Sequence, residues 1–328
     1  MDRRSFLGFG LGAAAAVSLP GRAQACGTSA GTVAPLGGAL GGVDSPLFGK
    51  VKFSPLKIEV GAKKPFRAVH CSDSHMAFMT VNDLVGGMKS DLDMYDYRLK
   101  EMANGIPSLA ACVLKARREN LPLFHTGDLY DYESEATHFM AADAFGGLDA
   151  YVYAPGNHEY HGHWGGGISG AAVTTSRQRL EKDVKRPVSV SSLVLNGVNF
   201  VAFDNGGLSF GLEQQQLAAI RREFEKGLPV VLLCHLPLYT EELYAAFTKS
   251  TGPRAGEKPI KAETMPWILC GMHAAEKPLL AYLAKQPLLK AVLCGHLHRE
   301  YQLAFTDKVT QYVAGATYKG NAYEITFC

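Results

Sequence analysis

The chain has 328 residues, of which 47% are hydrophobic and 20% are charged. This composition excludes a disordered protein and a small disulfide-stapled domain, because the apolar fraction is large enough to fill a core. Lys and Arg number 33 against 31 for Asp and Glu, so the formal net charge is only +2. Such a balance gives no extended basic field, and we expect no nucleic acid among the partners.

The first 25 residues have the features of an export signal. Met1-Asp2-Arg3-Arg4-Ser5-Phe6-Leu7 is a basic start, an apolar run follows over 8–19, and Ala23-Gln24-Ala25 has the pattern of a cleavage site. The run is too short to span a membrane. The paired arginines resemble the twin-arginine signal, although a general secretory signal would also fit. We therefore expect a periplasmic or secreted protein that uses the export machinery, with lipid attachment at Cys26 as the lesser alternative.

The rest of the chain is expected to form a Gly- and Ala-rich tether over 26–50 and one folded domain over 51–328. In the domain, apolar runs alternate with segments of helical periodicity, which indicates α/β layers around stacked sheets. Strands are predicted over 66–71, 121–126, 150–154, 229–234 and 290–294, a hairpin with an Asn196-Gly197 turn over 190–205, and short strands in the tail. Helices are predicted within 95–118, divided by Gly105 and Pro107, and over 134–144 and 212–226. No regular element is predicted over 239–271, a candidate lid.

Five of the predicted strands end in a short polar cluster that contains His, Asp or Asn. Together they supply Asp73, His75, Asp128, Asn157, His158, His235, His296 and His298. The carboxyl ends of strands in open α/β sheets are where ligand sites assemble. Imidazole, carboxylate and amide oxygen suit Mn, Fe, Zn, Co or Ni, and these groups are too many for one ion. We therefore expect two divalent or mixed-valence ions that share a carboxylate, as in sites for in-line displacement at phosphorus.

The clusters, in this order, resemble the calcineurin-like metallophosphoesterases over about residues 66–316. The motifs are Asp73-Ser74-His75, Gly127-Asp128-Leu129-Tyr130-Asp131, Gly156-Asn157-His158-Glu159, His235 and Gly295-His296-Leu297-His298. The resemblance implies a four-layer αββα sandwich of two mixed β-sheets flanked by helices. It also implies one metal on Asp73, His75, Asp128 and His298, and a second on Asp128, Asn157, His235 and His296, with Asp128 bridging.

By the same resemblance, the protein would hydrolyse a phosphomonoester or phosphodiester through in-line attack of a hydroxide held between the ions. His158 would be the catalytic residue, acting as general acid or oxyanion stabiliser rather than as a metal ligand. The alternative is a non-catalytic metal-binding or scaffold member of the same fold in the cell envelope. Scaffold members typically lose ligands, whereas every ligand position is filled here, and this favours the enzyme.

Departures from the motifs narrow the family. Purple acid phosphatases have Gly in place of His75 and a ligating Tyr in place of Asp131, and Ser/Thr protein phosphatases have Arg-Gly where this chain has Tyr132-Glu133. The broad phosphodiesterase and phosphomonoesterase group remains, and the motifs do not encode its small phosphoester substrates. Asp131 could bind metal, but a supporting or turn role is favoured.

The remaining polar residues are assigned from their positions along the chain. Asn157, His161 and His163 are candidate substrate contacts, although a solvated loop fits the Gly-rich segment 161–167 equally well. Outside the motifs, His70, His125, His138 and His273 are expected to be structural, and Tyr95 and Tyr97 are expected to pack against the helix's neighbours. Of the seven cysteines, Cys71, Cys234 and Cys294 are expected to be buried thiols, while Cys26 and Cys328 could pair.

Overall fold

The computed structural model describes residues 50–86, 89–160, 170–206, 214–250, 268–272 and 274–328. The predicted export signal, nearly all of the predicted tether and the segment 161–169, which carries His161 and His163, lie outside these residues. The division of the chain at residues 25 and 50 therefore stays a prediction. Within the described ranges, no helix is both long enough and apolar enough to cross a membrane.

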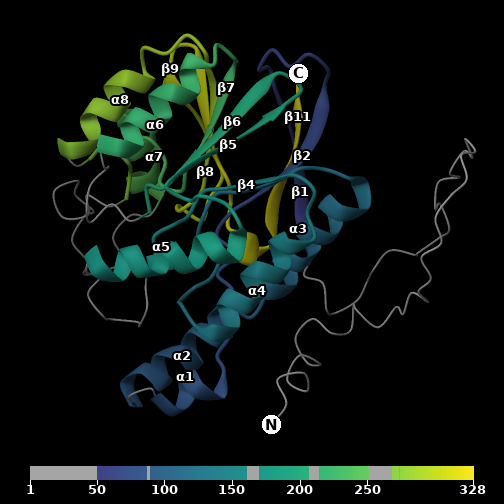
Figure 1. The fold of residues 1–328 in the computed structure, drawn as a ribbon, viewed down its shortest axis with the longest axis vertical. Helices are drawn as coiled ribbons and strands as arrows, with labels where there is room; N and C mark the ends of the chain where they lie inside the picture. Colours follow the sequence, from purple (N-terminus) through teal and green to yellow (C-terminus); the bar gives the residue numbers. More distant parts are fainter. Residues whose placement is uncertain (1–49, 87–88, 161–169, 207–213, 251–267, 273) are drawn as a thin grey trace, which may run out of the picture. The chain divides into compact units, whose positions relative to one another are not determined.

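Two mixed sheets form the centre of the domain (Figure 1). The first has the order β1 (Lys52–Ile58), β11 (Asn321–Phe327), β2 (Phe66–Cys71), β3 (Leu123–His125) and β4 (Tyr151–Tyr153). The second has the order β5 (Val190–Leu195), β6 (Val198–Phe203), β7 (Val230–Leu233), β8 (Leu289–Cys294), β10 (Val309–Val313) and β9 (Tyr301–Thr306). Strands β2, β3 and β4 run parallel, as do β6, β7, β8 and β10. Parallel strands end at one edge of their sheet, and this edge collects the polar clusters.

The two sheets pack face to face through alternating side chains. Phe124 of β3 and Phe327 of β11 meet Phe200 of β6, with ring centroids 4.7 and 5.0 Å from that of Phe200. The neighbouring residues Val201 and Phe203 point to the other face of β6 and join the core beneath the helices. Because such strands are buried on both faces, they read as continuous apolar runs in the sequence.

Helices cover the outer faces of both sheets. Helices α3 (Gly105–Glu119) and α4 (Glu135–Gly146) belong to the first sheet's side, and α5 (Gly170–Val184) packs beside α4. Helices α6 (Gln214–Glu225), α7 (Glu241–Ser250) and α8 (Lys277–Leu283) gather on the second sheet, and α1 (Val81–Gly86) and α2 (Lys89–Glu101) extend beyond the first (Figure 1). This arrangement confirms the predicted α/β fold of four layers.

The predicted elements are largely confirmed, with local corrections. The segment 95–118 is indeed divided, and Gly105 begins α3 where a Cβ would lie 2.4 Å from the Ser74 carbonyl oxygen. The hairpin turn has Asn196 and Gly197 in the left-handed region, as a type I′ turn requires. The prediction that 239–271 contains no regular element is wrong, because this segment contains helix α7 (Glu241–Ser250), whose Leu243 is buried in the core. Strand β1 and helices α1, α5 and α8 were not predicted.

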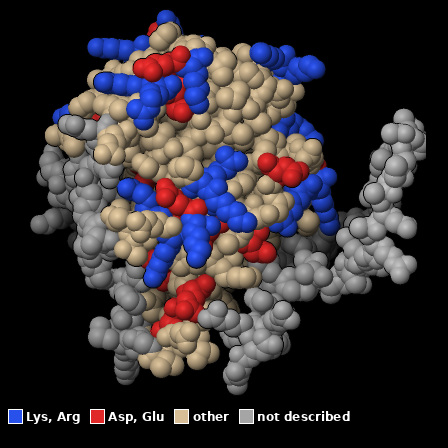
Figure 2. Space-filling view, in the orientation of Figure 1, with Lys and Arg blue, Asp and Glu red and all other residues tan. Residues whose placement is uncertain are grey.

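The surface carries mixed charge. On the face that Figure 2 shows, basic and acidic side chains are interspersed rather than gathered by sign. Arg67 and Lys115, for example, each pair with Glu324, at 2.6 and 2.7 Å. This is the pattern expected of a chain whose net charge is close to zero.

Candidate metal centre

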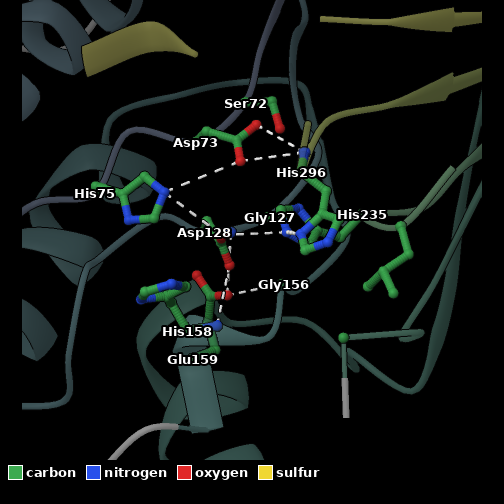
Figure 3. Close-up of polar contacts among 12 residues, drawn as sticks. Ser72, Asp73, His75, Gly127, Asp128, Gly156, His158, Glu159, His235 and His296 are labelled. Carbon is green, nitrogen blue, oxygen red and sulfur yellow. Dashed lines mark hydrogen bonds and ion pairs between the residues drawn. The ribbon is translucent and has the colours of Figure 1, made fainter. Parts of the chain in front are cut away.

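The polar clusters converge at the edge where the parallel strands end (Figure 3). Residues that follow β2, β3 and β4 come from the first sheet, and those that follow β7 and β8 come from the second. The structure thus brings together, from both sheets, Asp73, His75, Asp128, His158, His235, His296 and His298, and Asn157, whose side-chain oxygen is buried, directly precedes His158 in the chain. The roles of these residues as metal ligands and as catalyst remain predictions, but the Asp and His side chains have the proximity that those roles require.

The backbone at these strand ends is unusual. Five of the residues have positive φ angles: Asp73 (54°), His75 (45°), Asp128 (49°), His296 (70°) and His298 (53°). Non-glycine residues adopt this left-handed region rarely and at an energetic cost, so its use tends to mark functional sites. These residues follow β2, β3 and β8, and the left-handed turns after β2 let Asp73 and His75 of one motif face the same point.

The first group of candidate ligands is Asp73, His75, Asp128 and His298. One nitrogen or oxygen from each lies within 4.8 Å of the others. His75 Nε2 is 3.0 Å from His298 Nε2 and 3.5 Å from Asp128 Oδ2. His298 Nε2 is 3.3 Å from Asp73 Oδ1. These are the four residues expected to hold one ion.

The second group shares Asp128 with the first. His235 Nε2 is 3.2 Å from Asp128 Oδ2 and 3.2 Å from His296 Nδ1. Asn157 Oδ1 is buried and has no hydrogen-bond partner among the described residues. A buried amide oxygen without a donor suits a cation, as do the two imidazole nitrogens of His235 and His296 that face one another. The residues present therefore fit two ions with Asp128 between them.

The pKa values of the residues in the cluster are shifted far from their ordinary values. Burial alone would raise the pKa of Asp73, but the hydrogen bond and charge of His298 hold it well below its usual range. For Asp128, the charges of His235 and His158 likewise outweigh burial and lower the pKa. Burial would lower the pKa of His235, but the Asp128 carboxylate raises it to about 10. Burial and the charge of His235 lower the pKa of His296 to about 3. A proton on His235 therefore occupies a ligand position, and metal binding would displace it.

Asp131 supports this cluster from outside. His75 Nδ1 donates to Asp131 Oδ1 at 2.8 Å, and Arg98 of α2 binds the same carboxylate through both of its oxygens, at 2.5 and 2.7 Å. Asp131, His75 and His158 also lie close enough to form a third possible group of metal ligands. Arg98 already supplies a cation to the Asp131 carboxylate, however, so the geometry favours the supporting role over metal binding.

His158 lies beside the ligand groups. Its backbone N–H donates to Asp128 Oδ1 at 3.0 Å, and its Nδ1–H donates to the Asp131 carbonyl oxygen at 2.6 Å. The imidazole ring is edge-on to that of His75, with centroids 4.6 Å apart. This position suits a group that acts on a substrate held at the cluster.

The supporting roles of two residues were not predicted from the sequence. The buried Glu159 carboxylate accepts backbone N–H bonds from Asp128 at 3.1 Å, Gly156 at 2.6 Å and Leu129 at 2.5 Å, and so ties two motifs together. Burial and the Asp128 charge raise the pKa of Glu159 to about 7.

The second of these residues, Asn205, follows β6. Its Oδ1 accepts the backbone N–H groups of His235 and Leu236, both at 3.0 Å, and its Nδ2 donates to the Leu236 carbonyl oxygen at 2.8 Å. Asp204-Asn205-Gly206 is thus a sixth polar cluster at a strand end, and the rule that found the other five could have found it.

The other expectations have mixed outcomes. Cys71, Cys234 and Cys294 are buried and free, as predicted. The pairing of Cys328 with Cys26 is untested because Cys26 lies outside the described residues, as do His161, His163 and His273. Tyr95 packs on Tyr132, but Tyr97 is 57% exposed, so the packing role expected for Tyr97 is wrong.

The chain resembles several solved structures at low identity. A dimetal phosphatase from Danio rerio is 14% identical (TM-score 0.43; 77% of this chain and 88% of that chain covered). Calcineurin-like phosphoesterase YfkN from Bacillus subtilis is 11% identical, with a TM-score of 0.39, and the match covers 78% of this chain and 82% of that chain. A 5'-nucleotidase from Candida albicans is 12% identical, with a TM-score of 0.38, and the match covers 82% of this chain and 47% of that chain. No curated protein matches the chain.

The sandwich and its buried cluster of carboxylates and imidazoles are typical of metal-dependent phosphoesterases. The family model for calcineurin-like phosphoesterases matches residues 66–300. The chain therefore belongs to the calcineurin-like phosphoesterase family, and a hydrolase of phosphoesters is its class of enzyme.

Proposed function

We infer that this protein is an exported phosphoesterase that hydrolyses a small phosphomonoester or phosphodiester with two metal ions. The observation that carries the proposal is the position of Asp128. It belongs to both groups of candidate ligands, one completed by Asp73, His75 and His298 and the other by His235 and His296. The buried Asn157 Oδ1, which has no hydrogen-bond partner among the described residues, supports the same proposal.

Two bound ions would neutralise the oxygens of a phosphoryl group and make a water nucleophile available near neutral pH. The protein's own residues hold the geometry. Asp73 Oδ1 and Oδ2 accept the backbone N–H of His296 at 3.1 and 3.0 Å, which fixes the first motif to the fifth. Because the Nδ1–H of His158 is used by the Asp131 carbonyl oxygen, proton transfer to a leaving alkoxide would pass through Nε2.

The role of His158 is tested with His158→Ala. This variant keeps the backbone N–H that donates to Asp128, so we expect it to bind metal as the wild type does. Turnover should fall about 100- to 10,000-fold on esters with poor leaving groups, and much less on nitrophenyl esters, whose leaving group needs no proton. A variant that is fully active on both kinds of ester would exclude His158 as the acid.

The proposed activity itself is tested with metal-free protein loaded in turn with Mn, Fe, Zn, Co and Ni. Metal analysis should give two ions per chain, and a panel of chromogenic monoesters and diesters should reveal hydrolysis. Asp128→Asn is the control, because it weakens both groups at once and should abolish both readouts. Two bound ions without cleavage of any ester would contradict the proposal and favour the non-catalytic scaffold.

Export to the periplasm is supported by residues 1–25 of the sequence. The arginine pair is tested by replacing Arg3 and Arg4 with Lys, which should block export if the signal is of the twin-arginine type. Unchanged export would favour the general secretory route.

A further inference from the structure

Three of the candidate ligands, His75, His235 and His298, are histidines that face the cluster through Nε2. In each of them the other ring nitrogen, Nδ1, has a hydrogen-bond partner. His75 uses the Asp131 carboxylate at 2.8 Å, and His235 uses the Thr126 carbonyl oxygen at 2.7 Å. The side chains of both are almost fully buried, whereas that of His298 is 28% exposed. His298 is therefore the imidazole whose orientation packing fixes least, and its anchor matters most.

That anchor is Tyr318, whose Oη lies 3.2 Å from His298 Nδ1. Tyr318 is on the short 3₁₀ turn Thr317–Lys319 between β10 and β11, beyond residue 300, where the match to the family model ends. Its ring is also edge-on to those of His75 and His298, with centroids 5.4 and 5.3 Å away.

The turn is docked on the backbone of the first motif. The Thr317 N–H donates to the Ser72 carbonyl oxygen at 2.8 Å, and the Ser72 N–H donates to Thr317 Oγ1 at 3.2 Å. The Tyr318 N–H donates to the Asp73 carbonyl oxygen at 3.2 Å. One turn of the tail therefore contacts three of the four residues in the first group of ligands.

We propose that Tyr318 is a positioning residue that accepts the Nδ1–H of His298 and thereby presents Nε2 of that imidazole to the first metal ion. The inference rests on the proposed function. An imidazole that binds metal through Nε2 carries its proton on Nδ1, so the phenol oxygen is the acceptor. Loss of such an outer partner typically weakens metal binding about 10- to 100-fold.

The test uses Tyr318→Phe, which removes only the hydroxyl and keeps the ring. Tyr132→Phe is the matched control, because Tyr132 lies in the same hydrophobic cluster and its buried hydroxyl has no hydrogen-bond partner among the described residues. Metal-free wild type and both variants are titrated with Co²⁺. We expect one of the two Co²⁺ dissociation constants of Tyr318→Phe to rise about tenfold and the other to stay unchanged. The rise should lie at the low end of the range because a phenol is a weaker hydrogen-bond acceptor than a carboxylate. Tyr132→Phe should match the wild type.

A second readout is the exchangeable imidazole N–H resonances of the cobalt-loaded protein. One of them should exchange faster with solvent in Tyr318→Phe. Suppose that the wild type binds two ions and that Tyr318→Phe has the same two Co²⁺ dissociation constants and the same rates of imidazole N–H exchange. The inference then fails while the proposed function stands. Equal weakening of both sites would show that the hydroxyl acts on the fold, and this also overturns the inference. A wild type that binds no metal overturns the proposed function together with it.

Discussion

Asn205→Ala should destabilise the protein and weaken its second metal site. The Asn205 side chain is buried and makes three hydrogen bonds to the backbone at His235 and Leu236. These bonds fix the chain just where β7 delivers His235 to the cluster. Alanine removes them all and leaves two N–H groups without these partners, while the Leu236 carbonyl oxygen keeps only the weak Cys234 thiol donor at 3.4 Å.

The size of the effect follows from these bonds. A buried polar group left without its partner lowers the free energy of unfolding by about 1–3 kcal/mol. A water molecule that enters the vacated space would bring the cost for each group to the low end of this range. Three groups therefore give roughly 3–5 kcal/mol. At about 2 °C per kcal/mol for a domain of this size, the melting temperature of the metal-free protein should fall by roughly 6–10 °C. Release of the His235 backbone should also weaken the second ion by about 10- to 100-fold.

Asn199→Ala is the matched control. Asn199 is a buried asparagine on β6 that donates to the carboxylate and the backbone carbonyl oxygen of Glu223, at 2.9 and 3.3 Å, away from the cluster. Thermal unfolding and Co²⁺ titration are compared for both variants. Both should melt earlier, but only Asn205→Ala should lose affinity for one ion. If Asn205→Ala melts earlier and still binds both ions as the wild type does, Asn205 stabilises the fold without positioning His235.

Two further predictions concern pH and backbone packing. Burial lowers the pKa of His138, but its contacts with Asp183 and Glu133 raise it to about 9. Because the folded value lies above the ordinary one of 6.5, this stabilisation is complete below pH 6.5 and is lost as the pH rises through 9. Denaturation of metal-free protein at pH 6.5 and 10 should reveal a loss of up to about 3 kcal/mol that His138→Gln lacks. In Gly295→Ala, the new Cβ would lie 1.8 Å from Ser72 Oγ and 2.5 Å from Asp73 Oδ2. Metal titration should therefore show loss of the first ion, and unfolding should show about 1–3 kcal/mol of strain. A normal first site in Gly295→Ala would exclude this steric reasoning.

The sequence revealed which polar clusters meet at the ends of the strands because of how the strands are buried. Strands β7 and β8 are covered on both faces, so each reads as an apolar run, and the polar residue that ends the run is visible. The same reasoning explains why β1 was missed. This strand alternates exposed and partly buried residues, lies at the edge of its sheet and contains Pro55, which an edge strand tolerates.

Asn205 was missed for a different reason. The hairpin was predicted to run through residue 205, whereas β6 ends at Phe203. An error of two residues, which is usual at element boundaries, therefore placed Asp204 and Asn205 inside a strand and hid a strand-end cluster. Tyr318 carried no local signal at all. Its contact with His298 joins two loops that meet only because β8 and β10 pair in the folded sheet.

The left-handed backbone of the site explains how the fold and the metal centre depend on each other. Each non-glycine residue in this region costs about 1 kcal/mol or more, so the five that belong to the candidate ligands cost roughly 5 kcal/mol, a large share of the stability of a domain. Backbone bonds between motifs offset this cost: the Asp73 and His75 N–H groups donate to the Gly127 and Asp128 carbonyl oxygens, both at 2.9 Å, and the Gly295 N–H donates to that of His235 at 3.0 Å. Because main-chain groups hold the turns, replacing a ligand side chain should impair metal binding more than folding. Replacing a glycine that lets two motifs approach should impair both.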